Sequence, residues 1–121
     1  MTADDYCRGR LVDVAWQVAG KISFPAAVAV MFVIRNVVER NKDNNWIRAI
    51  DETYSGGAYS EPDTRDPEFQ KLLEVVDSVY DGTKVDSISN NALYFESGEG
   101  REECANVGGF RIFKDARKEL E

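Results

Sequence analysis

Two short aromatic runs lie near the C-terminal end of the chain, Asn90-Asn91-Ala92-Leu93-Tyr94-Phe95-Glu96-Ser97 and Asn106-Val107-Gly108-Gly109-Phe110-Arg111-Ile112-Phe113. The connection between them is polar and charged, and two such runs joined by a Gly-containing loop are typical of an irregular β-hairpin. A hairpin that follows a helical chain usually builds one wall of a cleft. We therefore expect a small C-terminal β-hairpin beside a helical domain.

The residues ahead of this hairpin predict two helices in succession. The first is expected from Asp4 to about Ala19, with Gly20 in the place of a C-cap glycine, because apolar residues recur at helical spacing. The second begins at Ser23-Phe24-Pro25, which combines a capping side chain with a proline in the first turn. It continues through the nearly all-apolar residues 26–34, and a helix that is apolar on all sides is normally the buried central one.

Two further helices are expected downstream. Asn44-Asn45 can start a short helix, and Asp66-Pro67-Glu68 starts an amphipathic helix that ends near Asp81-Gly82. Residues 54–65 between them contain two glycines, a proline and several hydroxyl side chains, which predicts a loop. With 121 residues and 43% apolar content, the chain is expected to form one domain, residues 1–121, with a single hydrophobic core.

Composition excludes several classes of function. The 22 acidic and 15 basic residues give a net charge of −7, from which the basic patch of a nucleic-acid-binding protein is hard to build. The chain has no histidine, which excludes Ser-His-Asp and Cys-His nucleophilic systems and HExxH zinc sites. Cys7 and Cys104 lack CxxC spacing, which favours free buried thiols over a zinc site or a disulfide. We therefore expect no metal and no cofactor.

The N-terminal residues also carry information about location. Residues 1–5 are polar and acidic and lack the pattern of a signal peptide, so we expect a cytoplasmic location for the chain as synthesised. The longest apolar run, residues 24–34, is about half the roughly 20 residues that a membrane span needs. No membrane span is therefore expected.

The order of these parts resembles the SleB-like cell wall hydrolases, which occur in spore cortex-lytic enzymes and in many bacteriophage genomes. The resemblance covers about residues 10–114 and is carried by Val28-Ala29-Val30 through Asn36 and by residues 92–95 together with residues 108–113. It implies a lysozyme-like α+β fold and cleavage of peptidoglycan glycan strands by a muramidase or lytic transglycosylase. We expect a phage-encoded chain of this family, which would act in the host cell or reside in the virion.

Within this resemblance, the position of the catalytic acid departs from the family. The chemistry needs a carboxylic acid with a raised pKa at a helix end, which in the family is a glutamate three residues before a glycine. Counting back from Gly20 gives Gln17, which has no proton to donate, and counting from Val28-Ala29-Val30 gives Val18. Asp13, one turn earlier and about 6 Å along the helix axis, is the nearest substitute. Gln17 has three alternative explanations. The acid was lost naturally, a glutamate was deliberately changed to glutamine, or the alignment is different and the fold is unrelated.

The resemblance also suggests residues that would contact a substrate. Tyr94 and Phe95 alternate on the predicted strand, so one of them can stack on a sugar ring while the other packs in the core, unless both pack. Trp46 and Tyr59 flank the loop that would form the opposite lip of the cleft, or they anchor that loop. Asn36 can hydrogen-bond across the cleft or brace the loop beside it.

Two functions from different classes follow. The first is a peptidoglycan glycan-strand hydrolase. The second is a catalytically silent relative that binds a glycan strand or a protein partner, as a virion component or an inhibitor. The net charge of −7 favours the second function, because a lysin that works on an anionic wall gains from a basic surface.

Overall fold

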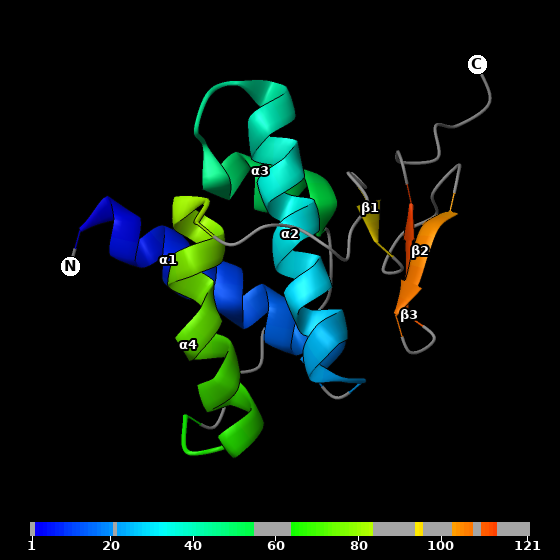
Figure 1. The fold of residues 1–121 in the computed structure, drawn as a ribbon. Coiled ribbons are helices and arrows are strands. Elements are labelled where there is room, and N and C mark those ends of the chain that lie inside the picture. Colours follow the sequence, from blue (N-terminus) through cyan, green and yellow to red (C-terminus); the bar gives the residue numbers. More distant parts are fainter. Residues whose placement is uncertain are drawn as a thin grey trace.

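The structure, a computed structural model, describes residues 2–20, 22–54, 64–83, 94–95, 103–107 and 110–113. In the last three segments the backbone is described and, among the side chains, that of Ile112. Along the chain the helical elements are α1 (Ala3–Ala15), the π-helical turn η1 (Trp16–Gly20), α2 (Phe24–Asn41), α3 (Trp46–Thr53) and α4 (Pro67–Asp81). The strands are β1 (Tyr94–Phe95), β2 (Glu103–Val107) and β3 (Phe110–Phe113), as labelled in Figure 1.

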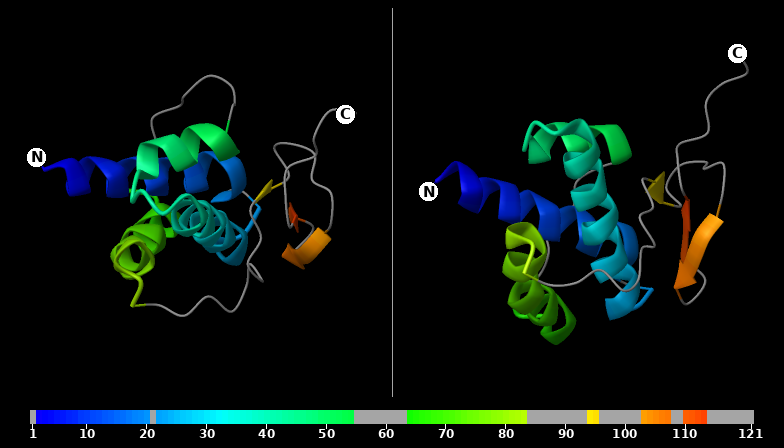
Figure 2. Two further views of the ribbon diagram at one scale, coloured as in Figure 1. Left: turned by 90° about the horizontal axis from the view of Figure 1, so that it is seen from above. Right: turned by 45° about the horizontal axis from the view of Figure 1, so that its top comes forward.

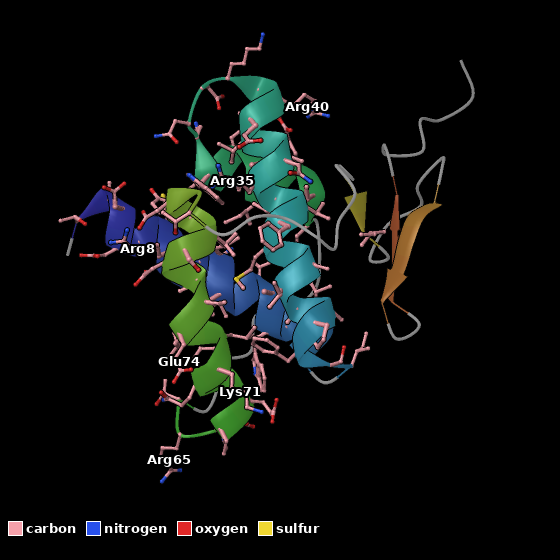
Figure 3. All side chains as sticks on the ribbon, in the orientation of Figure 1. Arg8, Arg35, Arg40, Arg65, Lys71 and Glu74 are labelled. Carbon is pink, nitrogen blue, oxygen red and sulfur yellow. The ribbon has the colours of Figure 1, made fainter. Side chains whose placement is uncertain are left out.

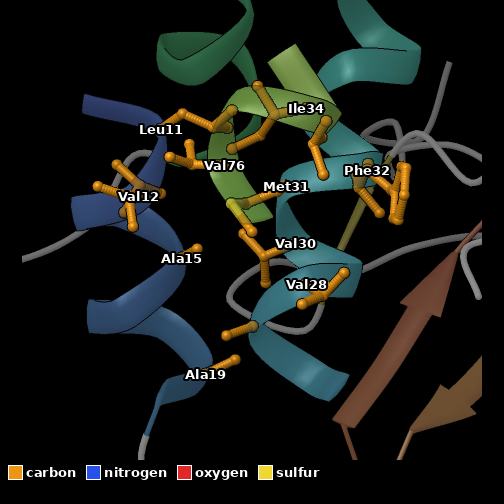
Figure 4. Packing of buried hydrophobic residues seen from close by; sticks show 14 of the residues in the cluster. Leu11, Val12, Ala15, Ala19, Val28, Val30, Met31, Phe32, Ile34 and Val76 are labelled. Atoms are coloured by element: carbon orange, nitrogen blue, oxygen red, sulfur yellow. The ribbon is translucent and has the colours of Figure 1, made fainter. Parts of the chain in front are cut away.

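Helix α2 lies at the centre of the helical domain, with α1, α3 and α4 packed around it (Figures 1 and 2). Every residue from 26 to 34 is buried, so the prediction of a central helix is confirmed. Figure 4 shows the side chains of Val30 and Met31 between α2 and the neighbouring helices. Their burial supplies the free energy that holds the helices together, at about 25 cal/mol for each Å² of apolar surface removed from water.

Local capping interactions fix where three of the helices begin. The Ser23 hydroxyl accepts a hydrogen bond from the amide of Ala26 at 3.2 Å, and the Asn45 side chain accepts one from the amide of Arg48 at 3.0 Å. Asp66 accepts one from the amide of Glu68 at 2.9 Å. Each cap satisfies one of the amides that a helix leaves without an internal partner at its first turn. The predicted starts of α2, α3 and α4 are therefore confirmed.

Helix α4 crosses α1 at a steep angle, and the two helices are in contact (Figure 2). Near the start of α1, the Tyr80 hydroxyl donates a hydrogen bond to the Asp4 carboxylate at 2.7 Å. At its far end, the ring of Trp16 meets the ring of Phe69 edge-on, with 5.5 Å between centroids. The pairing is thus polar at one end and aromatic at the other.

The predicted fold class, α+β with a lysozyme-like helical domain and a small C-terminal β-hairpin, is wrong. Helices make up 81% of the part of the chain whose side chains are described, and Ile112 of β3 is the one strand residue in its core. The predicted hairpin between residues 90–97 and 106–113 is not what the structure describes. The backbone strands instead form a three-stranded antiparallel sheet of order β1-β3-β2, and β1 and β2 lie against α2.

The error has a physical cause. Glu103 and Ala105 belong to the polar connection in the sequence, but they pair with β3, with an irregularity in the register between them. The alternating pattern in the aromatic runs cannot reveal this pairing. Among the residues whose side chains are described, the buried side chains around α2 come from the other helical elements, apart from Ile112. In the described ranges, no helix is both long enough and apolar enough to cross a membrane.

Candidate functional site

The first helix ends differently from the prediction, and this end contains the candidate site. α-Helical winding stops at Ala15, and Trp16–Gly20 form a π-helical turn in place of the expected continuation to Ala19. Single π-turns are rare and occur frequently at functional sites. Gln17, the position that the family resemblance marks, lies within this turn. We call Trp16, Gln17 and Gly20, together with Asp13 before them and Phe69 opposite them, the η1 site.

The close approach of Trp16 to Gly20 explains the glycine. A Cβ atom on Gly20 would lie 2.4 Å from Cε3 and 2.7 Å from Cδ2 of the Trp16 indole. Both distances are shorter than side-chain Cβ atoms tolerate, so only glycine fits while the indole keeps its place. Gly20 is therefore the last residue of η1 and a packing partner of Trp16, and the predicted C-cap role is wrong.

The turn is also held by its neighbours in the fold. Trp16 is half-buried and contacts Phe69 of α4, which is 3% exposed. The amides of Ile22 and Ser23 donate hydrogen bonds to the carbonyl oxygen of Ala19 at 3.0 and 3.2 Å, which leads the chain directly into α2. The position of η1 is thus determined by contacts with both α4 and the start of α2.

The two predicted acid positions are both half-buried in the structure. Gln17 lies in η1 and Asp13 lies one turn earlier on α1, and each of these residues has an interaction partner. From residue 14 to residue 20 the chain contains no aspartate or glutamate. The helix end therefore carries a neutral amide at the position that the resemblance assigns to the acid.

Two of the predicted substrate-binding residues, Trp46 and Asn36, lie away from this helix end. Trp46 is 3% exposed and its ring packs on Tyr80 with 4.7 Å between centroids, so it belongs to the core and cannot form an open lip. Asn36 is half-buried on α2, twelve residues beyond Phe24 and hence about 18 Å further along the helix axis. The structure therefore separates Asn36 and Trp46 from η1.

The structure describes only the backbone of two of the other predicted substrate-binding residues and nothing of the third. Tyr59 lies outside the described residues. Tyr94 and Phe95 form β1, whose register places Tyr94 opposite Phe113 and Phe95 opposite the buried Ile112. Their side chains lie outside the described part, so stacking on a sugar stays a prediction.

A polar cluster on the other end of the α1–α4 pair was not predicted from the sequence. Arg8 lies where α1 meets α4 (Figure 3). Its guanidinium lies 5.2 Å from the centroid of the Tyr80 ring and 3.3 Å from the Asp77 carboxylate. Burial, together with the hydrogen bond that its hydroxyl donates to Asp4, raises the pKa of Tyr80 above its ordinary value. The sequence feature that could have indicated this cluster is the helical spacing of its residues, with Asp4 and Arg8 on one helix and Asp77 and Tyr80 on another.

This cluster holds α1 on α4 and gives no indication of a reaction. Its groups are paired with one another, and the Tyr80 ring also packs on Trp46 from α3. Cys7 beside it is a half-buried free thiol. Within the described ranges, no group of three or more Cys, Asp or Glu side chains is arranged to hold a metal ion.

Nothing among protein-family models, curated proteins or solved structures matches this chain. The resemblance to SleB-like hydrolases thus stays a prediction that rests on the residues of the sequence. The η1 site is the place where that prediction meets an independent structural feature, because the π-turn contains Gln17.

Proposed function

We propose that this chain is a catalytically silent relative of the cell wall hydrolases that binds a peptidoglycan glycan strand at the η1 site. The observation that carries the proposal is the neutral amide of Gln17 in the π-turn, with no carboxyl group from residue 14 to residue 20. Cleavage of a glycosidic bond needs an acid that protonates the leaving oxygen. An amide cannot supply that proton.

The same side chain suits binding. A glutamine amide has two N–H donors and one carbonyl acceptor, so Gln17 can bond to the hydroxyl and acetamido groups of a sugar besides, or in exchange for, its partner in the fold. Trp16, which precedes Gln17 in the turn, is half-buried, and Ile22, just beyond the turn, is 47% exposed. Apolar and aromatic surface with a few polar groups is the usual composition of a ligand site. The net charge of −7 also suits a binder better than a lysin that must stay on an anionic wall.

Insoluble purified peptidoglycan provides a direct test. We expect the unmodified chain to co-sediment with it and to leave the turbidity of the suspension unchanged. Gln17→Ala should weaken co-sedimentation, because the two donors and the acceptor of the amide are lost. Gly9→Ala is the matched control on α1, since nothing lies within 4 Å of the added Cβ. A fall in turbidity with the unmodified chain would contradict a silent relative.

Hydrolysis is the second candidate, and the half-buried Asp13 one turn before Gln17 is the observation that favours it. If Asp13 is the acid, the unmodified chain clears the suspension and Asp13→Asn abolishes clearing. If the acid was lost at position 17, clearing appears only with Gln17→Glu. If the unmodified chain neither clears the suspension nor co-sediments with it, peptidoglycan is not its ligand, and a protein partner is the alternative.

A further inference from the structure

We infer that Trp16, Gly20 and Phe69 are positioning residues that set the direction of the Gln17 side chain toward its ligand. This inference rests on the proposed function, because it concerns how the η1 site binds. None of the three needs to touch the glycan for this role. They act through the shape of the π-turn in which Gln17 lies.

A π-turn changes the direction of every side chain that it contains. Residues of a regular α-helix advance by about 100° each, whereas a π-turn accommodates an additional residue in the same turn. Gln17 therefore points in a different direction from the one it would have if α1 continued unchanged through residue 19. Whatever maintains the π-turn also maintains the direction of the amide.

The contact between Trp16 and Gly20 is the part of the turn that tolerates least change. The indole atoms Cε3, Cδ2 and Cζ3 would lie 2.4, 2.7 and 3.0 Å from a Cβ at position 20. The first residue of η1 thus covers its last residue, with Gln17 between them in the sequence. An added methyl group must displace the indole or the backbone of the turn.

Phe69 connects this contact to α4. Its ring meets the Trp16 ring edge-on, with an interplanar angle of 79° and 5.5 Å between centroids. Phe69 is 3% exposed and belongs to the core, so its own position is fixed by packing. The indole therefore contacts a buried ring and also lies close to a glycine. Displacing it at either contact should change the direction of Gln17.

The experiment compares the two glycines of the α1–η1 segment. In ¹⁵N–¹H spectra of the full chain, Gly20→Ala should shift the indole N–H signal of Trp16 and the side-chain amide signals of Gln17, whereas Gly9→Ala should shift neither. Gly20→Ala should also weaken co-sedimentation with purified peptidoglycan about tenfold, the effect of losing a hydrogen bond or two. Phe69→Leu, which frees the indole without adding bulk, is the second variant if Gly20→Ala does not fold.

The outcomes separate this inference from the proposed function. Unchanged Gln17 amide signals in both Gly20→Ala and Phe69→Leu would overturn the positioning role. So would full binding by variants whose signals have moved. If the signals move as expected but the unmodified chain does not bind peptidoglycan, the positioning of Gln17 by Trp16 is supported and the proposed ligand is wrong.

Discussion

Gly82, which ends α4, provides the sharpest test of the packing described for this fold. Its φ of 80° lies in the left-handed region, and a Cβ there would lie 2.5 and 2.6 Å from the two terminal nitrogens of Arg35. The Arg35 guanidinium occupies this place because Nη1 donates a hydrogen bond to the carbonyl oxygen of Val79 at 2.7 Å, at the C-terminal end of α4 (Figure 3). Nη2 lies 2.8 Å from the Glu39 carboxylate.

Gly82→Ala therefore introduces two separate costs. The left-handed conformation costs a residue with a Cβ about 1–2 kcal/mol. Moving the guanidinium away from Val79 removes a charge-assisted hydrogen bond worth about 1.5 kcal/mol, the lower end of the range because the Arg35 side chain is 25% exposed. The alanine restricts the unfolded chain, which returns about 0.4–1 kcal/mol. We expect a net loss of roughly 2 kcal/mol in the free energy of unfolding.

A double-mutant cycle with Arg35→Ala separates the two costs. In the Arg35→Ala background no guanidinium remains to be displaced, so Gly82→Ala should cost only the backbone strain less the unfolded-state term, about 0.5–1 kcal/mol. The coupling energy between the two sites should then be at least about 1 kcal/mol, measured by urea unfolding followed by circular dichroism. Gly82→Asn relieves much of the strain but keeps a Cβ, so its coupling to Arg35 should persist. Equal costs of Gly82→Ala in both backgrounds would refute the proposed crowding.

Three other predictions concern Tyr80, Asn45 and Gly9. The pKa of Tyr80 is raised in the folded chain, so the neutral phenol stabilises the fold fully below its unfolded pKa of about 10. This stabilisation decreases as the pH rises above that value. Between pH 9 and about 11, the free energy of unfolding should therefore fall less for Tyr80→Phe than for the unmodified chain. Asn45→Ala removes the cap on the Arg48 amide and should cost about 1 kcal/mol in urea unfolding, whereas Asn45→Ser should restore most of it. Gly9→Ala should raise the free energy of unfolding by about 0.5–1 kcal/mol, and a loss would mean that the open space around position 9 is filled in solution.

The helix starts could be predicted from the sequence because their causes are local. Ser23 and Asn45 each bond to an amide three residues further on, and Asp66 bonds to one two residues further on. The interaction is therefore contained within a few consecutive residues that the sequence displays together. The same reasoning identified the end of α4 at Gly82, whose left-handed conformation suits glycine.

The candidate site depended on contacts between residues far apart in the sequence. The π-turn forms where Trp16 meets Gly20 and Phe69. The spacing of apolar residues in the first helix does not indicate that Phe69 of α4 contacts it. Trp46 was assigned to a lip because it borders a loop, but Tyr80 of α4 covers it. Apolar spacing predicts which face of a helix is buried, and it does not reveal which partner covers that face.

The two glycine contacts lead to opposite expectations for stability and for binding. Gly82 and Arg35 secure the C-terminal end of α4, whereas Phe69 near its beginning contacts the η1 site. A change at Gly82 should reduce the fraction of molecules that fold but leave the η1 geometry of each folded molecule intact, because Phe69 and Trp16 are untouched. A change at Gly20 should alter the site within molecules that remain folded. Binding normalised to the folded fraction should therefore be unaffected by Gly82→Ala and reduced by Gly20→Ala, a difference that general loosening of the helical domain would not produce.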